Sequence, residues 1–510
     1  MVAPPLYGLK PQKRKLPMDL WRLGRLWRTL FPPRRRPRPG SAGGKLLSCV
    51  RSFCQETELH SGQVRIDHIS NYFSIATLFI FLTGAPCLAA TDLAPTPPMG
   101  WNSWDSYGLT VTEAEFKANV SWFHQHLQPL GWQYVVVDEG WYLQHPGQKG
   151  AAQGFVMDAD GRYLVAGNRF SSSGFKPLAD WVHSQGLKFG LHIIRGIPRE
   201  AVEKNLPIAG SSFHASEAAN TADTCRWNSD NYGLKNNAAA QAYYDSIIKL
   251  YAGWGVDYIK VDCISNPYRA DEIHMMSAAI GKSGRAMVLS LSPGPTPIED
   301  ADDVKRYAQL WRISDDMWDT WSAPEGQTFP AGLVHQFDRT ARWAPHIEVG
   351  HWPDADMLPL GYLGPRPGWK EARVSRLTAD ESRTLMTLWA MARSPLVAGT
   401  NLTKMDPATQ ALYTNPEVIA VDQHSRENRE LSRTKSIVVW TATPQAGGGR
   451  YLAIFNLGDT SQEVNYSWRD LGLPEGAHAV RDLWARKDLG KPASLKTSLR
   501  AHASVLYLVR

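Results

Sequence analysis

Short apolar runs alternate with longer amphipathic stretches along the chain from Pro95 onward. The runs indicate buried strands, and the stretches between them, such as 176–183 and 238–250, have apolar residues at helical spacing. Eight strand candidates occur in this part of the chain: 99–101, 134–137, 189–193, 258–261, 287–291, 310–312, the region of 351–352, and 395–398. The pattern predicts an α/β fold, a (β/α)8 TIM barrel over 91–425. A doubly wound open sheet is the alternative, but no glycine-rich phosphate loop follows the first strand.

The pattern changes after about Arg426. Alternating runs at 436–440, 451–455 and 504–508 are separated by glycine-rich turns such as 447–449, with no long helical stretch between them. This pattern is typical of antiparallel strands. We expect a C-terminal antiparallel β-sandwich over 426–510 that packs against the barrel. A separate carbohydrate-binding role is the alternative.

Composition and charge distinguish the first 66 residues from the rest of the chain. The 510 residues are 43% hydrophobic and 20% charged, which excludes a disulfide mini-protein, a coiled coil and a disordered polymer. The first 66 residues contain 14 Lys and Arg against 3 Asp and Glu, so the net charge of +6 comes from this stretch. We interpret 1–62 as a basic disordered leader that is removed or never translated. A basic nucleic-acid-binding arm is the alternative, but the remaining chain is mildly acidic and we expect no nucleic-acid partner.

An apolar segment at 63–90 has the order of a secretory signal peptide. Arg65 precedes the apolar run 73–82, and small residues follow it up to Ala89 and Ala90, where we expect cleavage. The run is short for a membrane span of about 20 residues, so we expect no stable membrane insertion. A buried strand and an uncleaved anchor are the alternatives. The segment predicts a secreted or periplasmic protein.

Two of the five cysteines remain after this segment. Cys225 and Cys263 lie in the predicted barrel, whereas the other three precede the expected cleavage site. An even pair in an exported protein suggests one disulfide, and two unrelated buried thiols are the alternative.

Acidic residues follow several predicted strands. The residues just after each strand of a barrel line its active-site mouth. These positions hold acidic residues of strands 2, 4, 6 and 7: Asp138, Glu139, Asp262, Asp315, Asp316, Asp354 and Asp356. Four tryptophans are expected at the same rim: Trp101, Trp104, Trp141 and Trp352. A pocket with acidic residues and indole rings in its walls is suited to a sugar. Carboxylates accept hydrogen bonds from the sugar hydroxyl groups, and flat aromatic rings pack on the C–H faces of the sugar ring.

Other chemistries fit this set less well. No His-x-x-x-His or clustered Cys/His spacing suggests zinc, so we predict no metal site, and no cofactor is implied. A divalent ion held by the acids is the alternative, but Lys260 and Arg312 would oppose a cation there. Glycosidic cleavage with retention instead needs a carboxylate nucleophile and a second carboxyl group that donates a proton.

Asp262 is the candidate nucleophile. Lys260 lies two positions earlier, on the same strand face, and can hold Asp262 ionised. A structural Lys–Asp pair is the alternative. Asp316 is the candidate acid, and spacing alone leaves Asp315 and Asp319 as rivals.

Four motifs recur in an order that resembles glycoside hydrolase family 27, the retaining α-galactosidase and α-N-acetylgalactosaminidase family. The motifs lie at 98–104, 137–141, 260–263 and 354–358, and the resemblance extends from about Pro95 to the C-terminus. It implies a barrel followed by a β-sandwich and identifies Asp262 as nucleophile. The family acid/base stands four positions after the Arg of a Trp-Arg pair, which here selects Asp316.

The same resemblance implies the remaining roles. It assigns sugar contacts to Trp104, Asp138, Glu139, Lys260, Arg312 and Asp356, although the second acid of the Asp138–Glu139 pair is more often Asp. It also implies a disulfide between Cys225 and Cys263 that joins the loops after strands 3 and 4.

Two positions depart from the α-galactosidase pattern, and we include both among the substrate-binding residues. His192 replaces a common Tyr, and a buried core histidine is the alternative. Ser292 lies where many α-galactosidases have a Glu in contact with the 2-hydroxyl group, and it resembles the α-N-acetylgalactosaminidase pattern, whereas 293–295 matches neither.

We therefore expect a secreted, retaining exo-glycosidase that releases terminal α-linked galactose-type sugars from oligo- or polysaccharides by double displacement. An α-N-acetylgalactosaminide, a β-L-arabinopyranoside or an isomaltose-type α-glucan are alternative substrates. A non-catalytic carbohydrate-binding protein is the alternative of another class, and it would not need both Asp262 and Asp316. The sequence does not indicate an oligomeric state.

Overall fold

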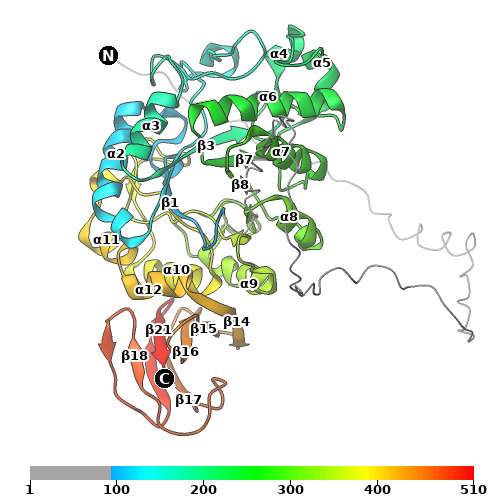
Figure 1. Cartoon of the computed structure of the whole chain (residues 1–510). Coiled ribbons are helices and arrows are strands. Elements are labelled where there is room, and N and C mark those ends of the chain that lie inside the picture. The colour runs from blue at the N-terminus through cyan, green and yellow to red at the C-terminus, as the bar shows by residue number, and fades with distance from the viewer. Residues whose placement is uncertain (1–92) are drawn as a thin grey trace, which may run out of the picture. The chain divides into compact units, whose positions relative to one another are not determined.

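A curled sheet of eight parallel strands forms the centre of the computed structural model, which describes residues 93–510 (Figure 1). The strands are β1 (Met99–Asn102), β2 (Tyr134–Val137), β3 (Lys188–Ile194), β7 (Tyr258–Asp262), β8 (Val288–Leu291), β9 (Leu310–Arg312), β10 (Trp352–Asp354) and β13 (Leu396–Ala398). Each pairs with its predecessor in this series up to β10, and β13 pairs with β1. A parallel bridge between Leu358, just after β10, and Ala398 of β13 links the two ends of the series. The predicted barrel is confirmed.

The expected leader (1–62) and signal peptide (63–90) lie outside the described residues. Within 93–510, no helix has the length and apolar character needed to cross a bilayer.

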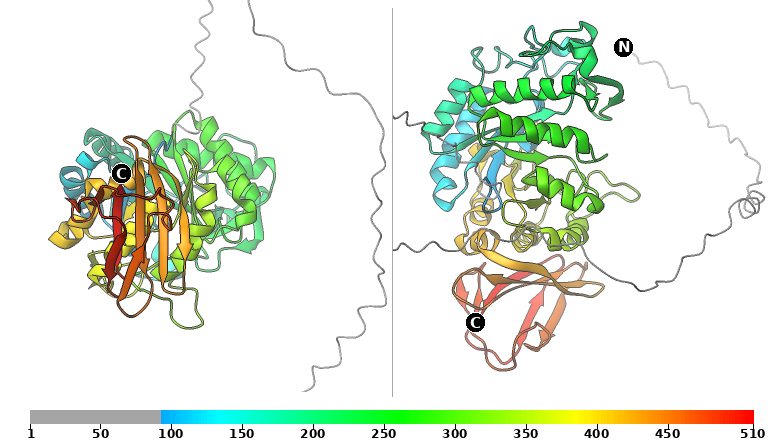
Figure 2. Two further views of the ribbon diagram at one scale, coloured as in Figure 1. Left: turned by 90° about the horizontal axis from the view of Figure 1, so that it is seen from below. Right: turned by 45° about the vertical axis from the view of Figure 1, so that its right-hand side comes forward.

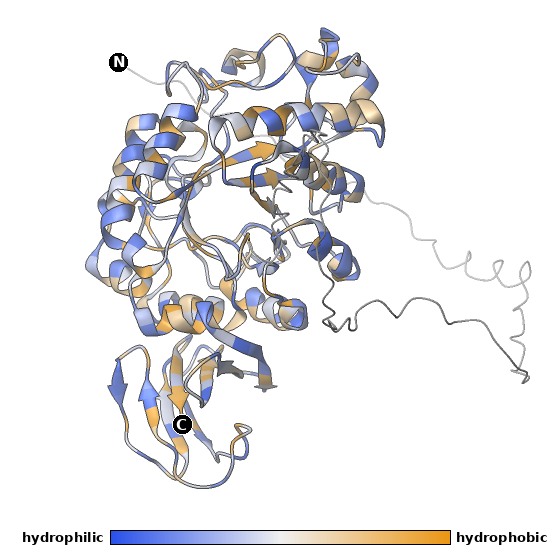
Figure 3. Cartoon of the chain, in the orientation of Figure 1, coloured by the Kyte–Doolittle hydropathy of each residue, from blue (hydrophilic) through white to orange (hydrophobic). Residues whose placement is uncertain are grey.

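Alternate side chains of a barrel strand point to opposite faces of the sheet, one toward the barrel interior and the other toward the helices. Tyr134 and Val136 of β2 pack with residues of β7, β8 and β9 in a cluster inside the sheet, whereas Val135 and Val137 belong to the large core shared with the helices. This is the period-2 arrangement expected of a strand that is covered on both faces. In Figure 3 the barrel strands are mostly apolar, and the helices of the outer ring mix apolar and polar residues.

Helices fill most of the crossovers between these strands, and two more follow β13. They are α1 (Trp104–Tyr107), α2 (Glu113–His126), α3 (Lys176–Ser184), α6 (Ala238–Trp254), α7 (Ala270–Ser283), α8 (Ala301–Tyr307), α9 (Leu333–Trp343), α10 (Ala379–Ala392), α11 (Pro407–Tyr413) and α12 (Pro416–Gln423). Capping boxes start α2, from Thr112 to Glu115, and α10, from Thr378 to Glu381. Each box satisfies backbone N–H groups that the first helical turn leaves without partners.

The crossover after β3 contains a small antiparallel sheet that was not predicted from the sequence. It consists of β4 (Ile197–Pro198), β5 (Ala219–Thr224) and β6 (Asn231–Leu234), with α4 (Arg199–Glu203) and α5 (Ala215–Ala218) in the same crossover. Cys225 lies in the turn between β5 and β6. A short antiparallel pair, β11 (Tyr362–Leu363) and β12 (Arg373–Val374), also follows β10.

The C-terminal part is the predicted antiparallel β-sandwich. One sheet has the order β14 (Ser425–Arg433), β15 (Ile437–Pro444), β16 (Arg450–Asn456), β21 (Ser504–Val509), β18 (Val480–Asp482) and β19 (Lys487–Asp488), and the other pairs β17 (Gln462–Tyr466) with β20 (Leu495–Leu499). Figure 2 shows the larger sheet from below. Val439 and Ile454 face the sandwich core, while Trp440 and Phe455 join the barrel core, where Phe455 packs at 5.0 Å from Phe337 of α9.

Candidate active site

One cleft of about 860 Å³ collects nearly all of the predicted site residues. Its walls include nine of the ten: Trp104, Asp138, Glu139, Lys260, Asp262, Ser292, Arg312, Asp316 and Asp356. Most of these side chains stand at or just after the carboxyl ends of barrel strands, where barrel enzymes carry their chemistry. The tenth, His192, is buried in β3 directly behind Asp262. The two candidate catalytic acids therefore face the same space.

Asp262 is the last residue of β7, and two groups fix its carboxylate. The imidazole Nε2–H of His192 donates to Oδ2 at 3.1 Å, and the backbone N–H of Cys263 donates to Oδ1. The side chain remains 17% exposed toward the cleft. Lys260, expected to be its ion-pair partner, instead donates to Asp138 Oδ2 at 3.0 Å. The Asp262 carboxylate is thus oriented by a backbone N–H group and an imidazole, without a direct hydrogen bond from Lys260.

Asp138 is a buried acid whose carboxylate accepts several hydrogen bonds. Its Oδ2 accepts hydrogen bonds from Asn102 at 2.7 Å and from Lys260. Burial raises the pKa of this carboxyl group, but the positive charges of His192 and Lys260 outweigh burial and hold the pKa well below its usual range. Asp138 is therefore an ionised acceptor that is held ready for a hydroxyl group.

Glu139 differs from its neighbour in its charge state. Asn228 donates to Glu139 Oε1 at 2.6 Å. Burial raises the pKa of Glu139 to about 7, and the negative charges of Asp262 and Asp138 add to the effect. Near neutral pH this side chain can donate as well as accept a hydrogen bond.

His192 lies between Asp262 and Asp138, below the cleft. Its Nε2 lies 3.1 Å from Asp262 Oδ2 and 4.0 Å from Asp138 Oδ1. Burial lowers the pKa of His192, but the two carboxylates outweigh burial and raise it above its usual value. His192 is thus a buried residue that does not itself line the cleft, although its imidazole bonds directly to the nucleophile candidate, and its predicted role in substrate binding stays a prediction.

Arg312 at the end of β9 joins the acid candidate to a buried aspartate. Its Nη2 lies 3.1 Å from Asp316 Oδ1 and 2.6 Å from Asp356 Oδ2. Asp356 also accepts the backbone N–H groups of Met317 and Met357, which bind it firmly to the wall. Asp316 itself is 42% exposed, so it can reach a bound ligand.

Asp315 and Asp319, the alternative acid candidates, lie in different surroundings. Asp319 is fully buried and forms ion pairs with Arg373 and Arg376, so it cannot reach the cleft. Burial raises the pKa of Asp319, but the hydrogen bonds from these two arginines outweigh burial and lower it. Asp315 lines the cleft beside Asp316, and burial raises its pKa.

Three of the four tryptophans expected at the rim are core residues instead. Trp101, Trp141 and Trp352 are fully buried, and each indole N–H donates to a backbone carbonyl, of Thr400, His192 and Ala94 respectively. Trp101 and Trp141 belong to the core shared with the helices, whereas Trp352 pairs in register with Leu310 of the inner cluster, and strand-end spacing alone does not reveal these directions. Trp104 does line the cleft.

Other residues that line the cleft were not predicted from the sequence. They are Asp105, Trp227, Asn228, Trp318 and Phe329, among others. Trp227 and Asn228 come from the turn of the unpredicted β4–β6 sheet, and Trp318 and Phe329 come from the long segment between β9 and α9. The short sequence spacing of Trp318 to Asp316 was an available signal, whereas the position of Trp227 depends on the disulfide.

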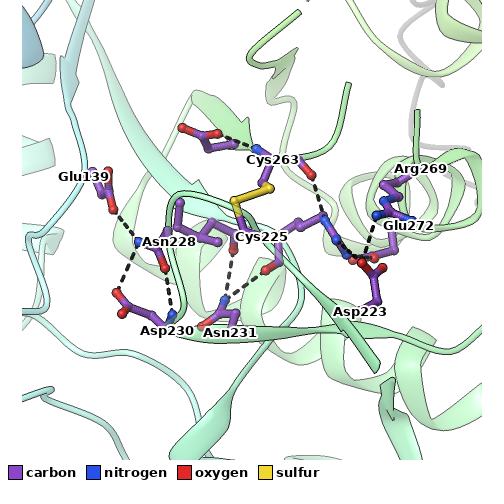
Figure 4. The surroundings of a disulfide bond; sticks show 12 residues. Glu139, Asp223, Cys225, Asn228, Asp230, Asn231, Cys263, Arg269 and Glu272 are labelled. Carbon is purple, nitrogen blue, oxygen red and sulfur yellow. Dashed lines mark hydrogen bonds and ion pairs between the residues drawn. A yellow bond between two sulfur atoms is a disulfide. The ribbon is translucent and has the colours of Figure 1, made fainter. Parts of the chain in front are cut away.

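A disulfide joins Cys225 to Cys263, as the sequence predicts, with the Cα atoms 5.9 Å apart (Figure 4). It ties the turn that carries Asn228 to the residue after the nucleophile candidate. Arg195 holds the same residue from the other side, because its Nε–H donates to the Cys263 carbonyl at 2.7 Å. Cys263 has φ of 63°, a left-handed conformation that costs a non-glycine residue energy and needs such support.

Arg195 is in turn held by two carboxylates behind the disulfide. Its guanidinium pairs with Glu272 and with Asp223, and Arg269 also reaches Asp223 at 2.8 Å. Glu272 accepts a further hydrogen bond from the Tyr244 hydroxyl.

Within residues 93–510, no group of three or more His, Cys, Asp or Glu side chains is arranged to hold a metal ion.

Comparisons with known proteins agree with this arrangement. Residues 229–424 match the family model described as alpha galactosidase A, and residues 434–509 match the alpha galactosidase C-terminal beta sandwich domain. The α-galactosidase of Coffea arabica is 29% identical over 429 residues, which cover 83% of this chain and 96% of that protein.

Two solved structures are more similar in sequence. A glycoside hydrolase family 27 β-L-arabinopyranosidase from Geobacillus stearothermophilus is 44% identical, with a TM-score of 0.78, covering 82% of this chain and 97% of that one. A putative α-N-acetylgalactosaminidase from Bacillus halodurans is 40% identical, with a TM-score of 0.70, over 81% of this chain and 96% of that one. With its barrel, its sandwich and its cleft of paired acids, the chain belongs to glycoside hydrolase family 27 and is a glycoside hydrolase of the α-galactosidase type.

Proposed function

We propose that this protein removes terminal galactose-type sugars from oligo- or polysaccharides with retention of anomeric configuration. The observation that carries the proposal is that Asp262 and Asp316 line one cleft in different surroundings. Asp262 is fixed by hydrogen-bond donors and is partly exposed to the cleft, and Asp316 is more exposed beside Arg312. A retaining glycosidase needs this division between a nucleophile and an acid.

The proposed reaction has two displacements. A carboxylate oxygen of Asp262 attacks the anomeric carbon while the protonated Asp316 gives its proton to the leaving oxygen, so the glycosidic bond breaks and a glycosyl ester forms. Asp316 then takes a proton from water, whose oxygen attacks the same carbon and displaces Asp262. Ionised Asp138 accepts hydrogen bonds from sugar hydroxyl groups throughout.

Two measurements test this proposal. Proton NMR during hydrolysis of nitrophenyl α-galactoside should show the α-anomer of galactose as the first product, and a first-formed β-anomer would refute retention. The Asp262→Asn variant should lose nearly all turnover. Turnover close to that of the wild type would remove Asp262 from the mechanism.

A second candidate substrate is a β-L-arabinopyranoside. This pyranose has the ring of α-galactose without its hydroxymethyl group, and the 44% identical structure is named a β-L-arabinopyranosidase. Glu139 supports this candidate, because it is one methylene longer than the aspartate usual in the family and leaves less room in the cleft. Comparing the nitrophenyl α-galactoside, β-L-arabinopyranoside, α-N-acetylgalactosaminide and α-glucoside by kcat/KM decides among them. The Glu139→Asp variant should shift preference toward the galactoside.

We further propose that the protein acts outside the cytoplasm. The predicted signal peptide at 63–90 and the disulfide between Cys225 and Cys263 support this location. Fractionation of cells that express the full chain, with N-terminal sequencing of the product, should find an exported protein that begins near residue 91. A product found in the cytoplasm with its N-terminus intact would refute the proposal.

A further inference from the structure

We propose that the C-terminal sandwich positions the acid candidate Asp316 through His502, whose ring stacks on Trp321. The inference rests on the proposed function, since it takes Asp316 as the group that protonates the leaving oxygen. It goes beyond that function, because it gives the sandwich a part in the reaction. We call residues 313–332, which lie between β9 and α9 and carry both Asp316 and Trp321, the acid segment.

The stacked pair joins the sandwich to the acid segment. His502 lies in the turn between β20 and β21 of the sandwich. Its imidazole lies over the indole of Trp321, with the ring centroids 3.8 Å apart and the ring planes 11° apart. Two flat rings in this arrangement share many atomic contacts, so a shift of one ring is opposed by the other. Fixing His502 therefore restricts Trp321.

His502 is itself fixed from three directions. Its Nδ1 lies 2.7 Å from Glu381 Oε1, and its Nε2 lies 3.1 Å from Asp459 Oδ1. Its carbonyl oxygen accepts a hydrogen bond from the Thr384 hydroxyl at 2.7 Å. Glu381 and Thr384 belong to α10, where Glu381 also closes the capping box. The imidazole is thus attached to a barrel helix, and it cannot turn away from Trp321 without losing these bonds.

The backbone of His502 shows the same constraint. Its φ is 59°, a left-handed conformation that costs a non-glycine residue energy. A glycine would adopt this conformation without the steric cost. The contacts of the imidazole therefore offset the strain of the turn, and this is the part of the residue that the fold uses.

Backbone hydrogen bonds carry the restraint from Trp321 to Asp316. The Trp321 carbonyl accepts the Val334 N–H at 2.8 Å, and the Asp316 carbonyl accepts the Ala331 N–H at 2.9 Å. Both bonds join the first half of the acid segment to the stretch that leads into α9. A displacement of Trp321 therefore displaces the backbone that carries Asp316.

A second contact reaches the acid segment through α9, which lies beside the sandwich (Figure 1). Phe455 of β16 packs against Phe337 of α9 with the ring centroids 5.0 Å apart. The neighbouring Gln336 donates from its side-chain amide to the Ser314 hydroxyl at 3.0 Å. Ser314 lies two residues before Asp316. The sandwich is therefore connected to the acid segment on both sides of Asp316.

The acid candidate depends on its backbone position more than the nucleophile candidate does. Within residues 93–510, the Asp316 carboxyl group has one hydrogen-bond partner, Arg312 at 3.1 Å, and the side chain is 42% exposed. Asp262 is held through both of its oxygens. A displacement of about 1 Å in a catalytic group can lower a rate by about 100-fold. Loss of the stacked pair should therefore impair proton donation before it impairs nucleophilic attack.

The test compares a substrate that needs the acid with one that does not. Melibiose releases glucose, whose oxygen must be protonated, whereas α-galactosyl fluoride releases fluoride without a proton donor. His502→Ala and Trp321→Ala should each lower kcat/KM for melibiose by about ten-fold and leave kcat/KM for the fluoride within about two-fold of wild type. Turnover of the fluoride also reports that a variant is folded, and Trp321→Ala tests the pair even where His502→Ala does not fold.

Two further variants make the result specific. Arg500→Ala is the matched control, because Arg500 lies in the same turn and pairs with Asp380 of α10. It should change neither substrate. The double variant His502→Ala with Trp321→Ala should lose no more than either single variant, because the two residues act through one contact.

Each other outcome also decides the question. Equal losses on both substrates, no loss on melibiose, additive losses in the double variant, or the same selective loss in Arg500→Ala would overturn the positioning role of His502. Asp316→Ala is measured beside these variants. Equal losses on both substrates in Asp316→Ala would refute its role as acid, and the proposed function and the inference would fall together. A selective loss in Asp316→Ala without one in His502→Ala would leave the proposed function standing and overturn the inference alone.

Discussion

Replacing Arg195 by methionine tests how the segment after the nucleophile is held. The Arg195 side chain is 2% exposed, and its partner Glu272 is 4% exposed, so the pair is shielded from water. Methionine keeps much of the length but leaves Glu272 without its cation and the Cys263 carbonyl without its donor. Breaking one side of a buried ion pair costs about 3–5 kcal/mol, because a charge stays buried without compensation. We expect a loss of that size in the free energy of unfolding, measured by urea denaturation.

The variant should also lose activity while it is still folded. Arg195 supports Cys263 in its left-handed conformation, and the Cys263 N–H binds the Asp262 carboxylate. A lower kcat for α-galactosyl fluoride, measured well below the unfolding transition, is the expected result.

A double variant and a matched control separate the pair from general damage. Because most of the cost is the charge left behind, Arg195→Met combined with Glu272→Leu should recover part of the stability lost in the single variant. Arg393 is a similarly buried arginine whose guanidinium bonds to the backbone carbonyls of Asp422 and Gln423, far from Asp262 in the sequence. Arg393→Met should lower stability without a specific fall in kcat. A loss below about 1 kcal/mol in Arg195→Met would refute the reasoning about the buried pair.

Three further predictions follow from the site. Asp316→Ala should retain hydrolysis of α-galactosyl fluoride, which needs no proton donor, far better than that of melibiose; equal losses on both would contradict its role as acid. Replacing Cys225 and Cys263 together by serine should cost about 4 kcal/mol of stability on the chain-entropy model for a separation of 38 residues, and an unchanged denaturation midpoint would contradict it. The raised pKa of Glu139, about 7, means that the folded state binds a proton more tightly than the unfolded state, so this residue lowers stability as pH rises from about 4.5 through 7. Glu139→Gln should therefore be stabilised relative to wild type more at pH 8 than at pH 4, as measured by thermal unfolding.

The barrel could be predicted because its strands are buried on both faces. The run 134–137 is apolar throughout and 288–291 is apolar except for Ser290, which is typical of interior strands, so the order of such runs indicates the topology. The acids at their ends could be predicted for the same reason, since the end of a strand marks the mouth of the barrel. Asp138, Asp262 and Asp356 all lie on the cleft as expected.

Side-chain partners and irregular segments could not be predicted in the same way. Lys260 and Asp262 share a strand face, but the lysine donates to Asp138, directly after β2, and this pairing depends on the barrel geometry. The strand β5 is polar and partly exposed, so it lacks the pattern that marks a buried strand. Because the sheet that contains β5 could not be predicted, the position of Trp227 in the turn after β5 could not be predicted either, although Trp227 lines the cleft.

Mass spectrometry can identify the residue that carries the covalent intermediate, and thereby the nucleophile. The protein would be incubated with 5-fluoro-α-galactosyl fluoride, which forms the glycosyl ester quickly and releases it slowly, and then digested and analysed by mass spectrometry. We expect one added fluorogalactosyl group, on the Asp262 carboxylate, and none in the Asp262→Asn variant. A group attached to Asp316, Asp315 or any other residue would contradict this expectation.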